Sequence, residues 1–390
     1  MGKHLPAAIL ANARYGFPSR GLKVIGVSGT DGKTTTVNMI YQVLKAADKK
    51  VSMISTINAV IGEQSFETGF HVTSPSRMDT QRLIRQAKKA GSEYLVLEVT
   101  SHALDQYRVW GIKFEVGVIT NITHEHLDYH KNWENYFQAK AKLIKDVKVA
   151  VLNRGETYFE RLSKMTKGKV LSFGLTKNAG FNPIKFPLKL KLPGEYNIMN
   201  ALAATAVCVS LGISADLIKR ILTDFSDLPG RMEEVENVKG IKIVIDFAHT
   251  PNALEQALKT LRSQTKGKLI AVFGAAGERD RAKRPLMGEV AAKYADLVVL
   301  TSEDPRKGDP MKIIKEIVEG YEKGKALSVK GKETLYKEPN RQKAIEMAIK
   351  MAKKGDTVGV FGKGHEKSMN IKGKEIPWSE KQAIEKAING

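Results

Sequence analysis

KVIGVSGTDGKTTT, residues 23–36, is the stretch that decides the fold of this chain. Its first half is apolar and predicts a strand, and apolar residues at helical spacing follow in 37–44. The turn between them, Gly29 to Thr34, would direct backbone N–H groups and a helix N-terminus at an anion. Lys33 is placed to reach the β- and γ-phosphates of a nucleotide, and the Thr34 hydroxyl to bind Mg²⁺. The stretch therefore predicts a nucleotide phosphate site rather than a plain glycine turn.

The glycine spacing in this stretch differs by one residue from the usual GxxxxGK[ST] pattern. Gly26 lies one position upstream of the first glycine of the pattern, and Val27 occupies that position. A strand and a helix nonetheless flank the turn, which is the context that the motif requires. We therefore keep the interpretation as a phosphate site.

Length and composition indicate a soluble globular protein. The 390 residues are enough for two or three domains. The hydrophobic content of 42% and the charged content of 27% are ordinary. The net charge of +21 is high and would suit nucleic acid, an anionic membrane surface or polyanionic substrates. Because the lysines are scattered and lie on expected helix faces, we favour a solvated basic surface that suits small acidic substrates.

Cysteine use and hydropathy indicate a cytoplasmic protein without a membrane partner. Cys208, the only cysteine, lies in a helical run, so no disulfide is expected. The sequence shows no signal peptide and no apolar run of about 18 residues. No nucleic-acid-binding module is recognisable either, and we expect a monomer.

From residue 22 onward, short apolar strands alternate with helices. Expected strands are 22–28, 51–55, 94–99, 115–120 and 148–152, and expected helices are 34–47, 79–90 and 134–145. This alternation predicts a parallel sheet with helices on both faces. A less regular stretch, 168–195, contains the strand-like FPLKLKL (186–192), and a helix-rich part follows in 197–222.

The sequence LPGR, 228–231, interrupts this series, and a second one follows it. Expected strands there are 241–246, 268–273, 296–301 and 356–361, and expected helices are 251–263, 285–293, 310–320, 341–353 and 379–388. We therefore expect an α/β protein with a short lead (1–20), a central nucleotide-binding domain with a parallel sheet (21–228) and a C-terminal, Rossmann-like open α/β domain (229–390). In such sheets ligands bind at the carboxyl ends of the strands.

Polar residues follow the expected strand next to the phosphate-loop strand. Glu98 ends that strand and is placed to hold Mg²⁺, which prefers one or two carboxylates plus phosphates. Ser101 and His102 follow and could contact a substrate. The loop TSPSR, 73–77, could donate hydroxyl and N–H groups to an anionic substrate, and a helix N-cap by one of its serines explains it equally well.

The next strand leads into NITHEHLDYH, 121–130, which holds three histidines, a glutamate and an aspartate. This nearly matches the HxHxDH pattern of zinc hydrolases, but Tyr129 separates Asp128 from His130. A second Mg²⁺ contact or a phosphate contact is therefore the favoured interpretation. In the second series, four loops at the carboxyl ends of strands would form one binding face: 246–251, 274–280, 301–306 and 362–366.

The chain resembles the Mur ligase family over residues 21–390, and within it the tripeptide-forming synthetases. The matching pieces, in order, are GTDGKTTT (29–36), TSP (73–75), EVTSHAL (98–104), NITHEHLDYH (121–130), Ala139-Lys140, LPGEYNIMNALAA (192–204), LPGR (228–231), DFAHTPNAL (246–254), GERDRAKRPLMG (277–288), EDPR (303–306) and GKGHE (362–366). GKGHE and the DPR element point to this branch rather than to folylpolyglutamate synthase, the nearest relative by reaction.

The resemblance implies an ATP- and Mg²⁺-dependent, ADP-forming amide ligase of peptidoglycan precursor synthesis. The D-glutamyl side-chain carboxylate of UDP-N-acetylmuramoyl-L-alanyl-D-glutamate would take the γ-phosphate, and the amine of an amino acid would then displace phosphate. The added amino acid would be meso-diaminopimelate or L-lysine. The alternative is a folylpolyglutamate-like or other Mur-type ligase on a substrate without UDP, and a nucleic-acid-associated ATPase is less favoured.

The resemblance also assigns roles to residues of this sequence. Those implied in catalysis are Lys33, Glu98, His126 and Lys140, of which Lys140 matches a lysine that the family carbamylates. Those implied in holding Mg²⁺ are Thr34, Glu98 and His126. Those implied in binding ATP are Gly29, Thr30, Asp31, Gly32, Lys33, Thr34, Thr35, Asn197, Asn200, Arg231, Asp246 and His249. Those implied in binding the muramoyl-peptide or the amino acid are Thr73, Ser74, Ser101, His102, Arg108, Asp304, Arg306, Gly362 and Glu366.

Two features depart from the pattern of the family. The family usually begins with a separate domain that binds the uridine diphosphate moiety, whereas only the short lead 1–20 precedes the phosphate-loop region here. The amino-acid-selecting motif usually reads DNPR in diaminopimelate-adding members and reads EDPR here. Arg306 can pair bidentately with the distal carboxylate of a diacid. Asp304 adds a negative charge at this place, so diaminopimelate and lysine both stay open.

Overall fold

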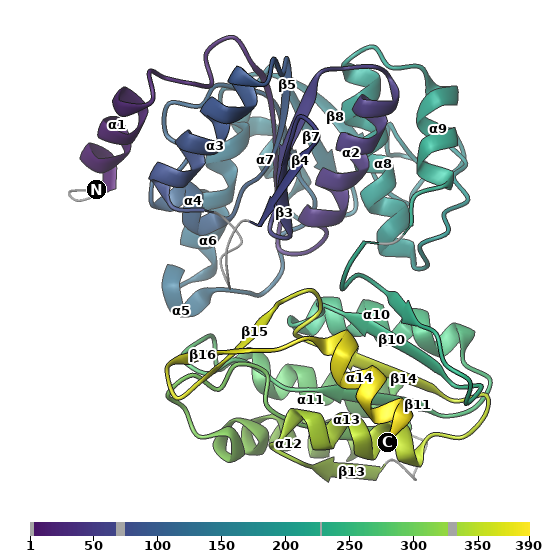
Figure 1. Ribbon diagram of the computed structural model, residues 1–390. Helices are drawn as coiled ribbons and strands as arrows, with labels where there is room; N and C mark the ends of the chain where they lie inside the picture. The colour runs from purple at the N-terminus through teal and green to yellow at the C-terminus, as the bar shows by residue number, and fades with distance from the viewer. Residues whose placement is uncertain (1–3, 68–74, 227, 327–333) are drawn as a thin grey trace. The chain divides into compact units, whose positions relative to one another are not determined.

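The chain forms two compact units in its computed structural model, which describes residues 4–67, 75–226, 228–326 and 334–390. The first unit comprises the chain up to Thr123 together with 132–226, and the second comprises 124–131 together with the chain from 227 onward. The α/β fold expected from the sequence is confirmed in both (Figure 1). Segment 124–131, which carries the histidine-rich motif, groups with the second unit although it lies within the first series of strands.

An eight-stranded sheet forms the centre of the first unit, in the order β4-β3-β2-β5-β1-β6-β7-β8. Its strands are β1 (Lys23–Ser28), β2 (Val51–Ile54), β3 (Asn58–Ile61), β4 (Gln64–Glu67), β5 (Tyr94–Glu98), β6 (Phe114–Ile119), β7 (Val149–Asn153) and β8 (Lys169–Phe173). Neighbours are parallel except at β2–β3 and β3–β4. The central strands β1 and β5 are almost entirely buried, as parallel strands covered on both faces require.

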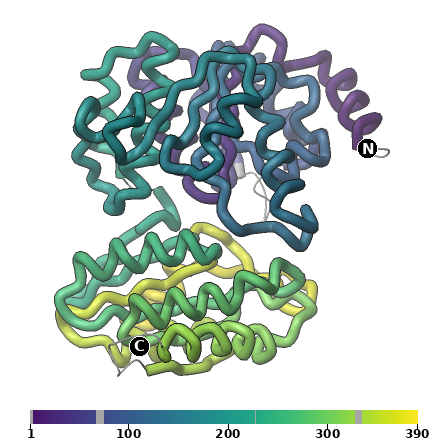
Figure 2. Tube along the Cα trace, turned by 180° about the vertical axis from the view of Figure 1, so that it is seen from behind, coloured from purple at the N-terminus to yellow at the C-terminus, as the bar shows by residue number. Residues whose placement is uncertain are grey.

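Helices cover both faces of this sheet. One group packs on one face: α2 (Lys33–Ala46), α8 (Glu195–Ser210) and α9 (Ala215–Thr223). The other face carries α3 (Arg77–Lys89), α4 (Ser101–Asp105) and α6 (Trp133–Ala141), the last continued by a 3-10 turn, Lys142–Ile144 (Figure 1). α7 (Phe159–Met165) contacts β7. α1 (His4–Arg14) packs on α3 at one edge of the unit, and α9 lies at the opposite edge in both views (Figures 1 and 2).

The expected strand at 186–192 is wrong. These residues run irregularly between β8 and α8, and none of the described strands pairs with them. Lys189 and Lys191 are exposed while the leucines between them are partly buried, so the alternation of the sequence appears in burial without a strand. Pro187 also lacks the N–H that a ladder would need.

A six-stranded sheet forms the centre of the second unit, in the order β13-β12-β11-β14-β10-β9. Its strands are β9 (Glu233–Val235), β10 (Lys242–Asp246), β11 (Leu269–Phe273), β12 (Leu297–Leu300), β13 (Thr334–Lys337) and β14 (Thr357–Phe361). Only β9 is antiparallel to its neighbour among these described strands. A separate hairpin, β15 (Ser368–Ile371) and β16 (Lys374–Pro377), follows β14.

Helices also cover both faces of the second sheet. α13 (Arg341–Met351) and α14 (Glu380–Asn389) share one apolar core with the strands. The other face carries α10 (Pro251–Gln264), α11 (Lys283–Tyr294) and α12 (Pro310–Ala326) (Figures 1 and 2). The short α5 (Leu127–His130) belongs to segment 124–131. None of the helices in the described ranges combines the length and apolarity that a transmembrane segment needs.

Candidate active site

The phosphate loop joins β1 to α2 and is held by the residues that follow β6. Gly29 has φ +157°, and a Cβ at this position would lie 1.7 Å from Thr120 Oγ1. Thr120 Oγ1 donates to Asp31 O at 2.6 Å. Asn121 Oδ1 accepts from the main-chain N–H groups of Thr30 and Asp31, at 3.0 and 2.9 Å. The loop is therefore preformed, and only glycine allows its close approach to β6.

The first turn of α2 presents the features of an anion site. Gly32 caps this helix with φ +79°, and a Cβ there would lie 2.2 Å from Asn200 Oδ1 of α8. Lys33 begins the helix, and its Nζ donates to Thr30 O at 2.8 Å, so the side chain lies over the loop. Asn200 Nδ2 in turn donates to Asn197 Oδ1 at 3.3 Å. The two asparagines expected to contact the nucleotide are thus brought to the phosphate loop.

Thr34 and Glu98, expected to hold Mg²⁺, lie together. Thr34 Oγ1 donates to Glu98 Oε2 at 3.0 Å, and the main-chain N–H of Thr56 donates to the same oxygen at 2.9 Å. Glu98 is 2% exposed at the end of β5. Among the described residues there is no group of three His, Cys, Asp or Glu side chains that could hold a metal alone. A hydroxyl and one carboxylate fit Mg²⁺ that takes its other ligands from phosphates and water.

Lys140 lies close to the phosphate loop through Tyr136. Its side chain on α6 is buried, and its Nζ lies 4.7 Å from the centroid of the Tyr136 ring. The Tyr136 hydroxyl is 2.9 Å from Thr30 Oγ1. Lysine side chains are seldom buried so deeply, so this environment suits a lysine that acts in the site.

The expected contacts to the muramoyl-peptide are only partly described. Ser101 and His102 form the first turn of α4, directly after Glu98, and Ser101 is buried. Arg108 donates from Nε and Nη2 to Gln106 Oε1 at 3.0 and 2.7 Å. Thr73 and Ser74 lie outside the described residues.

A buried ion pair fixes segment 124–131 to the second unit. Lys283 Nζ, at the start of α11, lies 3.1 Å from Glu125 Oε1, and both side chains are almost fully buried. His124 Nε2 lies 3.1 Å from Asp280 Oδ2. His126 caps α5 with φ +56°, and its Nδ1 is 3.7 Å from Glu125 Oε1. His126 therefore belongs to the second unit, whereas Thr34 and Glu98 belong to the first.

The loop after β10 brings together the residues expected to contact ATP from the second unit. Asp246 accepts from the main-chain N–H groups of Met232 and Ala248, both at 2.8 Å. The Arg231 guanidinium lies 4.6 Å from the centroid of the Phe247 ring. His249 Nδ1 lies 2.9 Å from Phe247 O. Asp246 thus holds the start of this loop and joins it to the chain at Met232.

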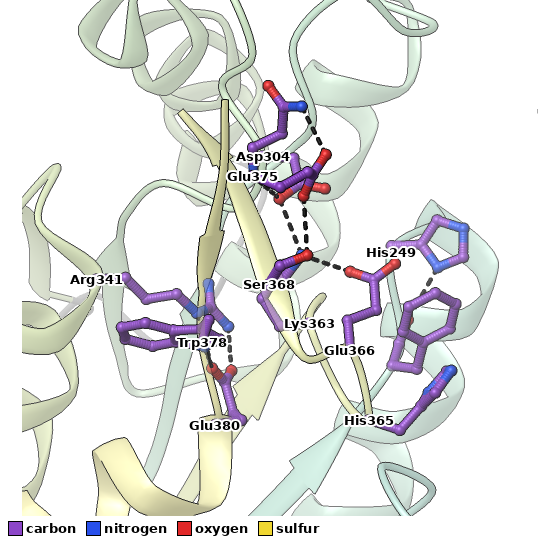
Figure 3. Close-up of polar contacts among 12 residues, drawn as sticks. His249, Asp304, Arg341, Lys363, His365, Glu366, Ser368, Glu375, Trp378 and Glu380 are labelled. Atoms are coloured by element: carbon purple, nitrogen blue, oxygen red, sulfur yellow. Dashed lines mark hydrogen bonds and ion pairs between the residues drawn. The ribbon is translucent and has the colours of Figure 1, made fainter. Parts of the chain in front are cut away.

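His365, which was not among the expected site residues, packs on the same aromatic ring. The ring centroids of His365 and Phe247 are 5.0 Å apart, and His249 packs on Phe247 at 4.6 Å. Burial, and next Arg231, lower the pKa of His365 to about 2, so its imidazole is neutral at physiological pH. Figure 3 shows His249 and His365 beside the chain that carries Glu366.

Five side chains at the ends of β11, β12 and β14 form what we call the charged cluster: Arg279, Asp304, Arg306, Lys363 and Glu366. Lys363 Nζ lies 2.9 Å from Asp304 Oδ1 and 2.5 Å from Glu366 Oε2 (Figure 3). Burial alone would lower the pKa of Lys363, but Glu366 and Asp304 raise it above its ordinary value. Lys363 is therefore a buried, charged link between two residues expected to select the amino acid.

The two arginines of the charged cluster lie close enough for the charge of one to act on the other. Arg306 Nε is buried and has no hydrogen-bond partner within the described ranges. Burial, and next the charge of Arg306, lower the pKa of the Arg279 guanidinium. The backbone of Arg306 is left-handed, φ +54°, and its N–H donates to Asn370 O of the β15–β16 hairpin at 2.9 Å. Two neighbouring cations, one with an unpaired buried N–H, make a site for an anion such as a carboxylate.

Glu303 adds a buried carboxyl group next to the charged cluster. Burial is the largest cause that raises its pKa, to about 7, and its Oε2 has no hydrogen-bond partner among the described residues. Gly362, with φ +106°, lies against it, and a Cβ there would be 3.3 Å from the Glu303 carboxyl. Arg279, Lys363 and Glu303 lie in motifs that the sequence singles out, but only their place at strand ends could have marked them as site residues.

These features define a class of protein: two α/β units, one with a phosphate loop at a helix N-terminus and one with charged loops at its strand ends. Family comparison narrows the class. The Mur ligase middle domain matches residues 27–208, and the Mur ligase, glutamate ligase domain matches residues 230–364. The chain therefore belongs to the Mur ligase family, as its motifs indicate, and is an ATP-dependent, ADP-forming ligase.

Relatives of this chain share one name, UDP-N-acetylmuramoyl-L-alanyl-D-glutamate–2,6-diaminopimelate ligase. The one from Aquifex aeolicus is 40% identical over 398 residues, covering 97% of this chain and 80% of that protein. The one from Clostridium botulinum is 38% identical over 401 residues, covering 98% and 81%. A solved structure of a ligase of this name has a TM-score of 0.62 and 29% identity, covering 95% of this chain and 79% of that one.

Proposed function

We propose that this chain adds meso-diaminopimelate to UDP-N-acetylmuramoyl-L-alanyl-D-glutamate in peptidoglycan precursor synthesis. Relatives that match nearly all of its length are named for that reaction. The observation that supports the choice of amino acid is the charged cluster, in which Arg279 and Arg306, one with an unpaired buried N–H, lie near two carboxylates that share one lysine.

The distal end of the added amino acid decides between diaminopimelate and lysine. In diaminopimelate that end bears an ammonium and a carboxylate, whereas in lysine it bears an ammonium alone. Glu366, the more exposed of the two carboxylates that contact Lys363, can accept the ammonium, and Arg306 and Arg279 can take the carboxylate bidentately. Lysine would leave the buried N–H of Arg306 unpaired, which costs the desolvation of that group. The cluster therefore supports the zwitterionic end of diaminopimelate.

The first domain, residues 21–228 in this proposal, would bind ATP and position the acceptor. Lys33 and the N–H groups of the first turn of α2 hold the phosphates, and Thr34 with Glu98 holds one Mg²⁺. When bound, ATP supplies the phosphoryl group that activates the acceptor carboxylate. Asn197 and Asn200 border the nucleotide.

The acceptor carboxylate would be reached from α4 and its neighbourhood. In this proposal the muramoyl-peptide is contacted by Ser101, His102 and Arg108, with Thr73 and Ser74, since the first two begin the helix that follows the strand ending at Glu98. We propose that Lys140 is carbamylated and bridges metal and phosphate, because it is buried beside the Tyr136 that contacts the loop.

The second domain, residues 229–390, would complete the nucleotide site and select the amino acid. Arg231, Asp246 and His249 contact ATP, supported by the fixed loop after β10. His126 helps to bind a second Mg²⁺. Gly362 leaves the space that a side chain would take from Glu303.

The proposal is tested by ADP release from ATP with the UDP-muramoyl-dipeptide and a panel of amino acids. We expect turnover with meso-diaminopimelate and at least tenfold lower kcat/KM with L-lysine, as for the loss of about one charge-assisted pairing. A folate acceptor with glutamate should give none. Preference for L-lysine would overturn the choice of amino acid, and absence of ADP release with every amino acid would overturn the acceptor.

A further inference from the structure

Lys363 is one of the most deeply buried charged groups of the second unit. Its side chain is 0% exposed, and its Nζ contacts both Asp304 and Glu366. A lysine of this kind is costly to bury unless its charge is compensated. One carboxylate would be enough to compensate the charge of Lys363, so the presence of two, Asp304 and Glu366, needs a separate explanation.

The two carboxylates that share Lys363 differ in what else holds them. Asp304 Oδ1 also accepts from the main-chain N–H of Asn370 in the β15–β16 hairpin, at 3.0 Å, and its side chain is 6% exposed. The side chain of Glu366 is 17% exposed, and it follows Lys363 by three residues in the same loop. Asp304 is thus held inward, while Glu366 is the carboxylate that a ligand can reach.

The charges of these three groups do not cancel. One lysine opposes two carboxylates, which leaves a formal charge of −1 (+1 − 2) at Lys363, Asp304 and Glu366. A ligand ammonium would bring the sum to zero. Without Lys363, two carboxylates would repel each other at this place, and Glu366 would lose the contact that fixes its position.

We propose that Lys363 is a positioning residue for amino acid selection: it neutralises Asp304 and holds Glu366 where that carboxylate accepts the distal ammonium of the incoming amino acid. This inference rests on the proposed function. It also removes the difficulty raised by an aspartate in the EDPR motif, because the charge of Asp304 is taken up by Lys363 and does not face the distal carboxylate.

The decisive variant is the double substitution Lys363→Met with Asp304→Asn, since Lys363→Met alone would leave Asp304 buried with an uncompensated charge and endanger folding. The double variant removes one positive and one negative charge, so its net charge equals that of the natural protein. Asp304→Asn alone is the reference variant, because it removes the same carboxylate but keeps the contact between Lys363 and Glu366, so the difference between the two variants reports the loss of Lys363.

KM for diaminopimelate, ATP and the UDP-muramoyl-dipeptide, kcat and the thermal midpoint are measured for the three proteins. We expect the double variant to raise KM for diaminopimelate about tenfold, the effect of losing one charge-assisted contact, with KM for the other substrates unchanged. Asp304→Asn alone should raise KM for diaminopimelate clearly less than the double variant does, because Lys363 still holds Glu366 there.

Three outcomes decide the matter. A folded double variant with natural KM for diaminopimelate overturns the role of Lys363, and so does a parallel rise of all three KM values, which marks a merely structural role. An equal rise of KM in the Asp304→Asn reference variant overturns it as well, since Lys363 is present there. Failure of the proposed function is recognised separately, because the natural protein itself would then release no ADP with diaminopimelate.

Discussion

Gly26 and Gly29 serve different purposes, which explains the unusual spacing around the phosphate loop. A Cβ on Gly26 would lie 2.7 Å from Leu143 Cδ1 and from the Phe114 ring, so this glycine allows side chains to pack on β1. Gly29 instead allows the loop to approach Thr120. Gly26, which lies one position away from the first glycine of the usual motif, is therefore a packing residue of the strand and not part of the phosphate loop.

Lys33 is the residue whose loss should affect ATP turnover most directly. Its Nζ lies over the phosphate loop, 2.8 Å from Thr30 O, where it can neutralise charge that moves onto the phosphates. We expect Lys33→Ala to lower kcat for ADP release by at least about a hundredfold. The exposed Lys45 on the same helix supplies the control, and Lys45→Ala should retain full activity. Full activity of Lys33→Ala would contradict the assigned role.

Glu303 should make the stability of the protein depend on pH. Burial raises its pKa in the folded state to about 7 from an ordinary value of 4.5, so folding favours the neutral carboxyl. The contribution of this neutral carboxyl to the free energy of unfolding is fully present below about pH 4.5 and is lost as the pH rises toward 7. The side chain of Glu303→Gln is neutral at every pH. At pH 8 the free energy of unfolding of this variant, measured in urea, should exceed that of the natural protein by about 3 kcal/mol, and at pH 4.5 the two should be equal.

Exposed Glu319 on α12 provides the comparison for this experiment. Glu319→Gln should follow the urea midpoint of the natural protein at both pH values. A difference between natural protein and Glu303→Gln that is the same at pH 4.5 and pH 8 would show that the carboxyl does not titrate in this range.

The candidate site could be predicted from sequence where its residues follow strands that the pattern of the chain places side by side. Thr34 and Glu98 were expected to meet because both follow neighbouring parallel strands, and they do. The pair Glu125–Lys283 joins residues 158 positions apart, and no local pattern indicates it. The contact between Lys363 and Asp304 was not predictable either. The motif marks the loop that carries Lys363, but only the fold brings Asp304 to it.

At the level of elements, Arg341 joins three parts of the second unit. Its guanidinium donates to Ser302 O after β12 at 3.0 Å, to Phe361 O of β14 at 2.8 Å, and to Glu380 of α14 (Figure 3). Both Arg341 and Glu380 are 1% exposed. This pair holds the ends of two strands to the last helix, beside the loops of the charged cluster.

Removing one member of this pair should destabilise the second unit strongly. Arg341→Met leaves the buried Glu380 carboxylate without its cation, and we expect a loss of about 3–5 kcal/mol in urea unfolding. The double variant Arg341→Met/Glu380→Gln should recover part of that loss. Arg82→Met breaks an exposed pair with Asp79 and should cost less than about 1 kcal/mol. Equal urea midpoints for Arg341→Met and Arg82→Met would refute this account.

Long, buried elements were predictable, and short or polar ones were not. The central strands of both sheets are continuous apolar runs between helices, which is a strong pattern. β3, β4, β9 and the β15–β16 hairpin have three or four residues each and are partly exposed, so their sequences differ little from loops. The segment 186–192 is the opposite case, a strand-like sequence that forms no strand. Its alternating leucines and lysines differ in burial, but none of the described strands pairs with them.

At the scale of the whole molecule, the net charge of +21 needs an explanation that fits a ligase. ATP and the proposed acceptor both carry phosphates, and the acceptor adds carboxylates. A basic surface raises the local concentration of such substrates and their rate of association. The same charge would also favour nucleic acid, so the two explanations have to be separated by experiment.

The dependence of activity on salt distinguishes attraction of small polyanionic substrates from binding of nucleic acid. We expect kcat/KM for the UDP-muramoyl-dipeptide to fall severalfold between about 0.05 and about 0.5 M salt, with kcat nearly constant, because screening weakens attraction at a distance but not contacts in the site. Duplex DNA and RNA should not stimulate ADP release in the absence of the acceptor. Stimulation by either, with the steep salt dependence of phosphate-backbone binding, would instead favour a nucleic-acid-dependent ATPase. The single substitution Lys45→Ala should leave this salt dependence almost unchanged, because it removes one of the 63 Lys and Arg charges.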